Sequence, residues 1–124
     1  KAHRDHWFER LAKLHGKADI PQEQKERSYQ VMAAWDGYMA ASAAAFQKER
    51  NVRRMVILAG SGHIDRGFGI PTRIAKLTGG KVATVRIEVG AVAAHAIAEP
   101  VSDFIVFVEA QSLTFHGGKF TPKK

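Results

Sequence analysis

The chain has 124 residues, of which 45% are hydrophobic and 25% are charged, and this composition excludes an intrinsically disordered protein. Its 19 Lys and Arg residues against 12 Asp and Glu residues give a net charge of +7, which favours an anionic partner. The basic residues form no continuous stripe, so dedicated nucleic-acid binding is not expected. The absence of cysteine excludes disulfides and thiolate metal sites, and no apolar run is long enough to span a membrane as a helix.

The N-terminal segment has neither an initiating Met nor an apolar core, so it is not a signal peptide, and we expect this N-terminus to be a trimmed or cleaved end of a longer protein. Apolar residues at helical spacing then predict a helix over residues 3–15 that ends at Gly16. His3 and His6 share a face of this helix, and a surface position is favoured for both. No histidine pair has the spacing of a zinc site, so a zinc centre built from this chain alone is not expected.

A long helix is predicted over residues 21–49, after a start signal that includes Asp19 and Pro21. Its residues are mostly good helix formers, and its apolar side chains cover a wide surface that something else must bury. Two adjacent lines make up this surface: Tyr29, Met32, Asp36 and Met39, and beside them Val31, Trp35, Tyr38 and Ser42.

After the long helix, the pattern changes to strand and loop signals. An unbroken apolar run predicts a buried strand over residues 53–60. A loop with four glycines follows over residues 60–69, and a two-turn helix with Pro in its first turn is predicted over residues 70–77.

Two more strands are predicted over residues 81–89 and 102–108, while residues 91–98 fit a helix or a loop. Strands alternating with helices indicate an α/β fold, with layered helices on a largely parallel sheet. Three strands close such a core poorly, so we expect the C-terminal half of a larger α/β domain. Residues 1–110 would form this partial domain, and residues 111–124 a basic polar tail that forms an edge strand or frays.

The glycine loop is the first candidate site, because ligands of open parallel sheets bind beyond the carboxyl ends of the strands. His63 lies three residues past the apolar run, and Gly60 and Gly62 allow a sharp turn and the close approach of a ligand. The loop contains no dinucleotide fingerprint or phosphate loop, and it lacks the G-x-S-x-G pattern of a serine nucleophile. A tight turn with a surface histidine explains the same residues equally well.

The apolar surface of the long helix is the second candidate. Methionine at helical spacing usually belongs to a core, and that interpretation is sufficient here. The alternative is a flat apolar wall for a planar cofactor, because tyrosine, methionine and histidine side chains all ligate iron. Asp36 on this surface needs a partner, either a nearby arginine or the imidazole of His63.

Three blocks of sequence together carry a family pattern. Residues 55–64 (MVILAGSGHI) and 67–74 (GFGIPTRI) give an apolar strand, then G-x-G-H, then G-I-P and a basic helix. Residues 35–40 (WDGYMA) give a W/K-D-x-x-M-A helix, and residues 101–105 (VSDFI) give a final strand. This combination resembles the ChaN-like haem-binding uptake family over about residues 25–108.

The resemblance implies an α/β domain from a bacterial periplasmic or outer-membrane lipoprotein that binds haem in iron acquisition. It carries His63 and Asp36 over by motif, whereas Tyr38 falls at a variable position. The family's first half, with its leading strand and acidic/His motif, has no counterpart here, and Met32 stands where many relatives have Gln. More distant relatives of the fold include hydrolases that use His and Glu residues.

We therefore expect a haem-binding protein rather than an enzyme, with the cofactor against the long helix and the GSGH loop. As the axial ligand of iron, Tyr38 is favoured before Tyr29, since phenolate suits ferric iron, and His63 is either the ligand or a propionate partner. Arg53, Arg54, Arg66 and Arg73 are the candidates for the propionates. The expected cofactor contacts are completed by Asp36, Met39 and Gly62.

Two other functions stay open. In a hydrolase of the same superfamily, His63 would act as a general base or metal ligand, with carboxylates from the absent half. In a ligand-free interaction module, the glycine loop would only be a turn. The wide helix surface predicts association with a missing N-terminal half or with a second copy, and any membrane attachment would come from a lipid anchor outside this chain.

Overall fold

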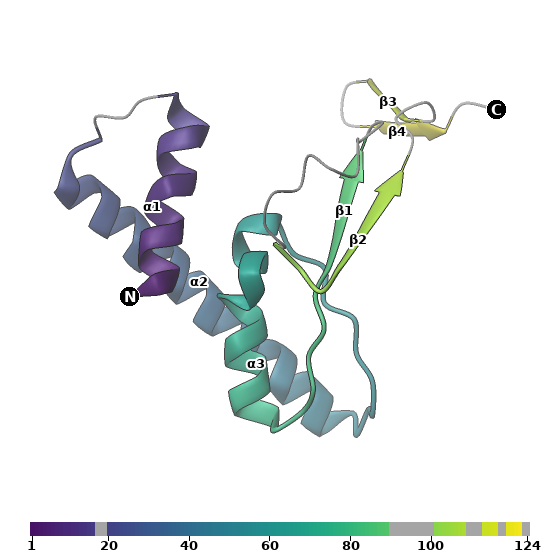
Figure 1. Cartoon of the computed structure of the whole chain (residues 1–124). Coiled ribbons are helices and arrows are strands. Elements are labelled where there is room, and N and C mark those ends of the chain that lie inside the picture. The colour runs from purple at the N-terminus through teal and green to yellow at the C-terminus, as the bar shows by residue number, and fades with distance from the viewer. Residues whose placement is uncertain (17–19, 90–100, 109–112, 117–118, 123–124) are drawn as a thin grey trace.

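The computed structural model describes residues 1–16, 20–89, 101–108, 113–116 and 119–122. It is a mixed α/β structure, as the alternation of helix and strand signals predicts. Figure 1 shows the helices on one side of a parallel pair of strands, with a small separate hairpin near the C-terminus.

Two helices of very different length form the N-terminal part. The first, α1, spans Ala2–His15 and ends at Gly16, whose left-handed φ of 58° closes the last turn. The second, α2, spans Gln22–Glu49. Both helices are confirmed, although α2 begins one residue after Pro21, and the predicted cap at Asp19 lies outside the described residues.

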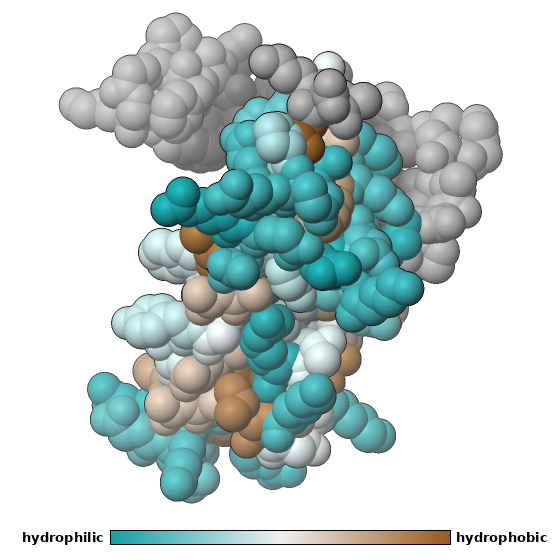
Figure 2. Space-filling view, turned by 90° about the vertical axis from the view of Figure 1, so that its left-hand side faces the viewer, coloured by the Kyte–Doolittle hydropathy of each residue, from teal (hydrophilic) through white to brown (hydrophobic). Residues whose placement is uncertain are grey.

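The core lies where α2 crosses the third helix, α3, which spans Ile70–Thr78. Ala40 is fully buried, and Ile70 and Ile74 are almost completely buried against it. Small residues on α2 let the two helices approach closely, as the Ala-rich stretch around residue 40 allows. Figure 2 shows hydrophobic side chains toward the lower end of the molecule, where Figure 1 places α3 and the C-terminal turns of α2.

The parallel strands are β1, Val85–Val89, and β2, Phe104–Val108. Each is shorter than its predicted range because the residues before it are not paired. The two strands are tied at their starts by the Asp103 carboxylate, which accepts hydrogen bonds from the Thr84 backbone N–H at 2.7 Å and from its hydroxyl at 2.8 Å. These bonds lower the pKa of Asp103.

The prediction of a buried strand over residues 53–60 is wrong. The segment contains no assigned strand in the described structure, and Val56 and Leu58 are 85% and 89% exposed. Their neighbours Ile57 and Ala59 pack against the α2–α3 core. An unbroken apolar run indicates burial on both faces only if other strands and a second layer flank it, and here one face alone is covered.

The face of the sheet that points away from the helices is apolar. On β1, Arg86 points toward the helices and pairs with Asp65 at 3.3 Å, so its strand neighbours point the opposite way. The parallel register places β2 side chains directly beside them. The exposed residues on this face are Val85, Ile87, Val89, Phe104, Val106 and Val108.

The tail forms a hairpin of its own. Strands β3, Leu113–His116, and β4, Lys119–Pro122, pair antiparallel with each other and not with β1 or β2. The prediction for residues 91–98 falls outside the described residues. Within the described part of the chain, no helix is long and apolar enough to cross a membrane.

Candidate functional site

Asp36 and His63 meet although 27 residues separate them in the chain. Asp36 projects from the middle of α2 and is completely buried. His63 ends a short 3-10 turn, η1, over Ser61–His63, and its Nδ1 lies 2.7 Å from Asp36 Oδ1. A carboxylate at this distance holds the Nδ1–H tautomer, which leaves Nε2 as the free acceptor or ligand atom.

The second oxygen of Asp36 is surrounded by cations and rings but makes no hydrogen bond in the described structure. Arg73 Nη1 lies 3.6 Å from Oδ2, and His3 Nε2 lies 3.9 Å from it. The buried carboxylate is therefore balanced by the charge of Arg73, and α1 closes the site through His3.

Gly69 makes room for this arrangement. Its φ of 66° and ψ of −121° suit only glycine. A Cβ added there would lie 2.4 Å from the His63 carbonyl oxygen and 2.9 Å from Asp36 Oδ2. The glycine of the G-I-P motif thus lets the loop backbone pack directly against the Asp36–His63 pair.

A second buried carboxylate fixes the loop to its neighbours. Asp65 opens the next 3-10 turn, η2, over Asp65–Gly67, and is 3% exposed. Arg10 of α1 donates to Asp65 at 2.8 Å and to the Ser61 hydroxyl at 2.8 Å, and Arg86 of β1 approaches Asp65 from the sheet at 3.3 Å. The loop that carries His63 is therefore held between α1 and β1.

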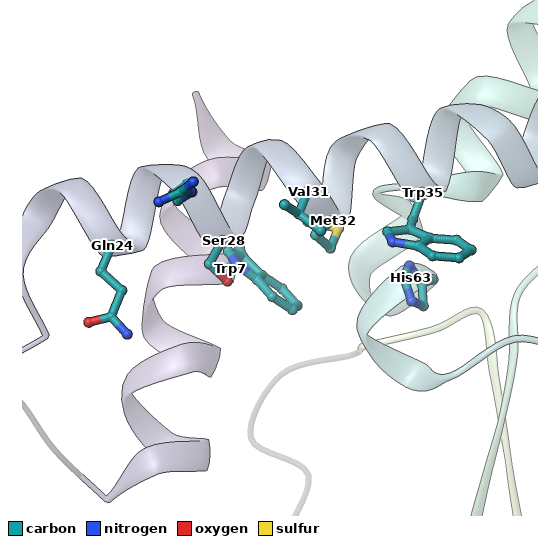
Figure 3. A pocket seen from close by; sticks show the side chains of 8 residues that line it. Trp7, Gln24, Ser28, Val31, Met32, Trp35 and His63 are labelled. Carbon is teal, nitrogen blue, oxygen red and sulfur yellow. Dashed lines mark hydrogen bonds between the residues drawn. The ribbon is translucent and has the colours of Figure 1, made fainter.

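A groove of about 670 Å³ runs along α2 beside His63. Figure 3 shows Gln24 at one end and Trp35 with His63 at the other, and Trp7 of α1 lies between the ends. The Trp7 indole N–H donates to the Ser28 hydroxyl at 3.2 Å, which fixes the ring. The lining residues are Trp7, Gln24, Arg27, Ser28, Val31, Met32, Trp35 and His63. The volume and the aromatic walls are typical of a small-molecule site.

His3 and His6 are half-buried, whereas the sequence favoured surface positions for both. Both rings lie tilted beside the Phe68 ring, with centroids 5.3 and 5.9 Å away. Burial lowers the pKa of both imidazoles; the Asp36 carboxylate opposes this at His3, and the Arg66 charge adds to it at His6. Two neutral histidines therefore help to attach α1 to the loop.

The structure separates the other residues that the sequence puts forward. Tyr38 lies on α2 but is 71% exposed and does not line the groove, and Tyr29 packs edge-on against His3 at 5.5 Å. Met39 packs on the α2–α3 core. Gly62 faces α1, and the Arg66 backbone N–H donates to the Val101 carbonyl at 2.7 Å.

Of the groove residues, only His63 was among the expected cofactor contacts. Val31, Met32 and Trp35 belong to the apolar helix surface that was the second candidate site, whereas four residues were part of neither candidate: Trp7, Gln24, Arg27 and Ser28. The helical spacing of Gln24, Ser28, Val31 and Trp35 is a signal that the sequence does contain. Trp7 has no such signal, because its place opposite α2 depends on how α1 folds back.

One family model matches the chain over residues 1–74, described as "Haem-binding uptake, Tiki superfamily, ChaN". The chain belongs to this family. The match begins at α1, which the sequence motifs did not include, and it covers α2, the glycine loop and the start of α3. No curated protein and no solved structure matches the chain.

The groove of this ChaN-family chain fits the haem that the family description names. Haem iron can be held by one side-chain ligand on one face of a flat apolar ring, and the groove offers one imidazole, at the end where Trp35 lies. A bare metal ion would need several ligands, and no group of three His, Asp or Glu side chains suited to a metal occurs in the part of the chain that the structure describes.

Proposed function

We propose that the chain binds haem in the groove along α2, with His63 Nε2 as the axial ligand of the iron. The observation that carries the proposal is the 2.7 Å contact between His63 Nδ1 and the fully buried Asp36. It aims the other ring nitrogen away from the carboxylate, on a residue that lines an aromatic groove.

The surrounding residues support this role for His63. Asp36 fixes the tautomer and the orientation of the ring, as carboxylate partners of ligating histidines do. Trp35 and Trp7 provide flat apolar surface for the macrocycle. When bound, haem supplies an iron centre. Its reduction potential and the affinity of the chain for haem depend on this ligand and its hydrogen bond.

The sequence favoured Tyr38 as the ligand, and the position of His63 changes that order. Tyr38 is 71% exposed and is not among the residues that line the groove, whereas His63 is. His63 is therefore our first candidate, and Tyr38 is tested beside it. The Tyr29 ring is engaged with His3 and Phe8.

Hemin titration followed in the Soret region tests the proposal. We expect saturation near one haem per chain, and a loss of at least about tenfold in affinity for His63→Ala. His15→Ala removes an exposed imidazole at the end of α1 and serves as the matched control. Unchanged spectra and affinity in His63→Ala, together with a change in Tyr38→Phe, would transfer the ligand role to Tyr38.

A hydrolase is the second candidate, because the same contact favours it. A histidine held by a buried carboxylate at 2.7 Å has the geometry of a general base. We expect this function only if the chain hydrolyses an activated ester without hemin and His63→Ala abolishes that activity. Hemin binding without such activity supports the haem proposal.

We place this haem-binding role in bacterial iron acquisition outside the cytoplasm. The support is the family's description as haem-binding uptake proteins and the sequence resemblance. Fractionation of cells that produce the full-length protein tests the location, and recovery in the cytosol alone would contradict it.

A further inference from the structure

The groove has two chemically different ends. His63 and Trp35 form one end, and Gln24 lies at the other (Figure 3). Arg27 also lines the groove, and like Gln24 it belongs to the N-terminal turns of α2, at least two turns before Trp35. Eight residues separate Arg27 from Trp35, which corresponds to about 12 Å along the helix axis. A ligand that touches both ends must therefore be extended along α2.

Apolar and aromatic residues line the groove between these ends. Val31 and Met32 of α2 and Trp7 of α1 lie in this middle section. The Trp7 ring is fixed by its hydrogen bond to Ser28. A flat hydrophobic body fits this section, and it would place any charged group at one end.

Arg27 is available for an anion. Its side chain is exposed, and in the described structure it has no hydrogen bond or ion pair. The neighbouring Glu26 is already bound to Arg4 at 3.1 Å, so it does not neutralise Arg27. A guanidinium binds a carboxylate through two parallel hydrogen bonds, and the Gln24 amide adds a further donor beside it.

From this placement we infer that Arg27 binds a propionate carboxylate of haem. This inference rests on the proposed function. With iron on His63, the edge of the macrocycle that carries both propionates faces the N-terminal turns of α2. The site then selects tetrapyrroles with free carboxylates, and its affinity depends on salt.

The test compares hemin with its dimethyl ester, which keeps the iron and the ring but loses both negative charges. For the unmodified chain we expect hemin to bind more tightly than the ester. Arg27→Gln should weaken hemin binding about three- to tenfold and leave ester binding unchanged. Arg50→Gln removes the same charge from an exposed position outside the groove and should change neither affinity.

Iron-free protoporphyrin separates the two proposals. One outcome is that protoporphyrin binds with an affinity that falls in Arg27→Gln, while His63→Ala leaves the affinity for hemin unchanged. The propionate site then stands, and the ligand role of His63 fails. If hemin binds through His63 but Arg27→Gln does not change its affinity, the propionate site is overturned. The same follows if the ratio of hemin affinity to ester affinity is equal in Arg27→Gln and in the unmodified chain. If neither ring binds, both proposals fail.

Discussion

At the scale of single residues, the Asp36–His63 pair shows what a motif predicts. The sequence offered two partners for Asp36, an arginine or His63, and the structure places His63 at 2.7 Å and Arg73 at 3.6 Å. A carboxylate in an apolar face needs compensation, so the need for a partner was predictable. The contribution of His3 was not, because nothing in α1 alone indicates that it folds back onto Asp36.

Gly69 gives the sharpest prediction at this scale. Gly69→Ala should lower the free energy of unfolding by about 3 kcal/mol or more, since it combines backbone strain with a collision against the His63 carbonyl. Gly67→Ala has a similar φ of 69° but open space around its Cβ, so about 1 kcal/mol of strain is expected there. Urea unfolding followed by circular dichroism measures both, and equal losses would show that the collision is relieved.

The half-buried histidines His3 and His6 predict a dependence of stability on pH. Burial holds the pKa of His3 and His6 below the ordinary 6.5, so below that pH the unfolded chain binds more protons than the folded one. The free energy of unfolding should therefore fall as the pH drops from 6.5 toward the lowered values. We expect the fall in the free energy of unfolding between pH 7.5 and 5 to be smaller in His6→Phe and unchanged in His15→Gln. If the two variants show the same dependence on pH, His6 does not contribute to it.

At the scale of elements, helices were predicted well and one strand was not. The bounds of α1, α2 and α3 agree with the sequence within one or two residues, because spacing, caps and glycine stops act locally. Whether residues 53–60 form a strand depends on a hydrogen-bonding neighbour from elsewhere in the chain. The apolar run alone carries no information about that neighbour.

The close crossing of α2 and α3 can be tested at Ala40. Ala40→Leu forces extra volume between Ile70 and Ile74 and should destabilise the fold by about 1–3 kcal/mol. Ala41→Leu makes the same change one position along, where the side chain is exposed, and should stay within about 0.5 kcal/mol. A comparable loss in both variants, measured by thermal unfolding, would count against tight packing at this crossing.

At the scale of the whole molecule, the α/β class was predictable and the groove was not. Class follows from the order of the elements. The groove needs the relative placement of α1, α2 and the glycine loop, which the chain specifies only through distant contacts such as Arg10 with Asp65 and Trp7 with Ser28. His63 was therefore found by its motif, and Arg27 was missed.

The uncovered apolar face of β1 and β2 predicts poor behaviour at high concentration. Exposed apolar patches and short unprotected sheets promote association, so light scattering should rise with protein concentration. Ile87→Lys places a charge in the centre of this face, where the side chain is 63% exposed, and should suppress the rise. Val82→Lys, outside both strands, is the control; equal suppression by both would indicate a general effect of charge.

The two tryptophans have a practical consequence for the groove. The chain contains only Trp7 and Trp35, and both line it. All indole emission of the protein therefore arises at the candidate site, without any background from elsewhere. A chromophore that enters the groove would quench the whole signal by energy transfer, and single replacements of either ring by phenylalanine would resolve which end is approached first. The molecule carries its own optical probe for the site, with no label to attach.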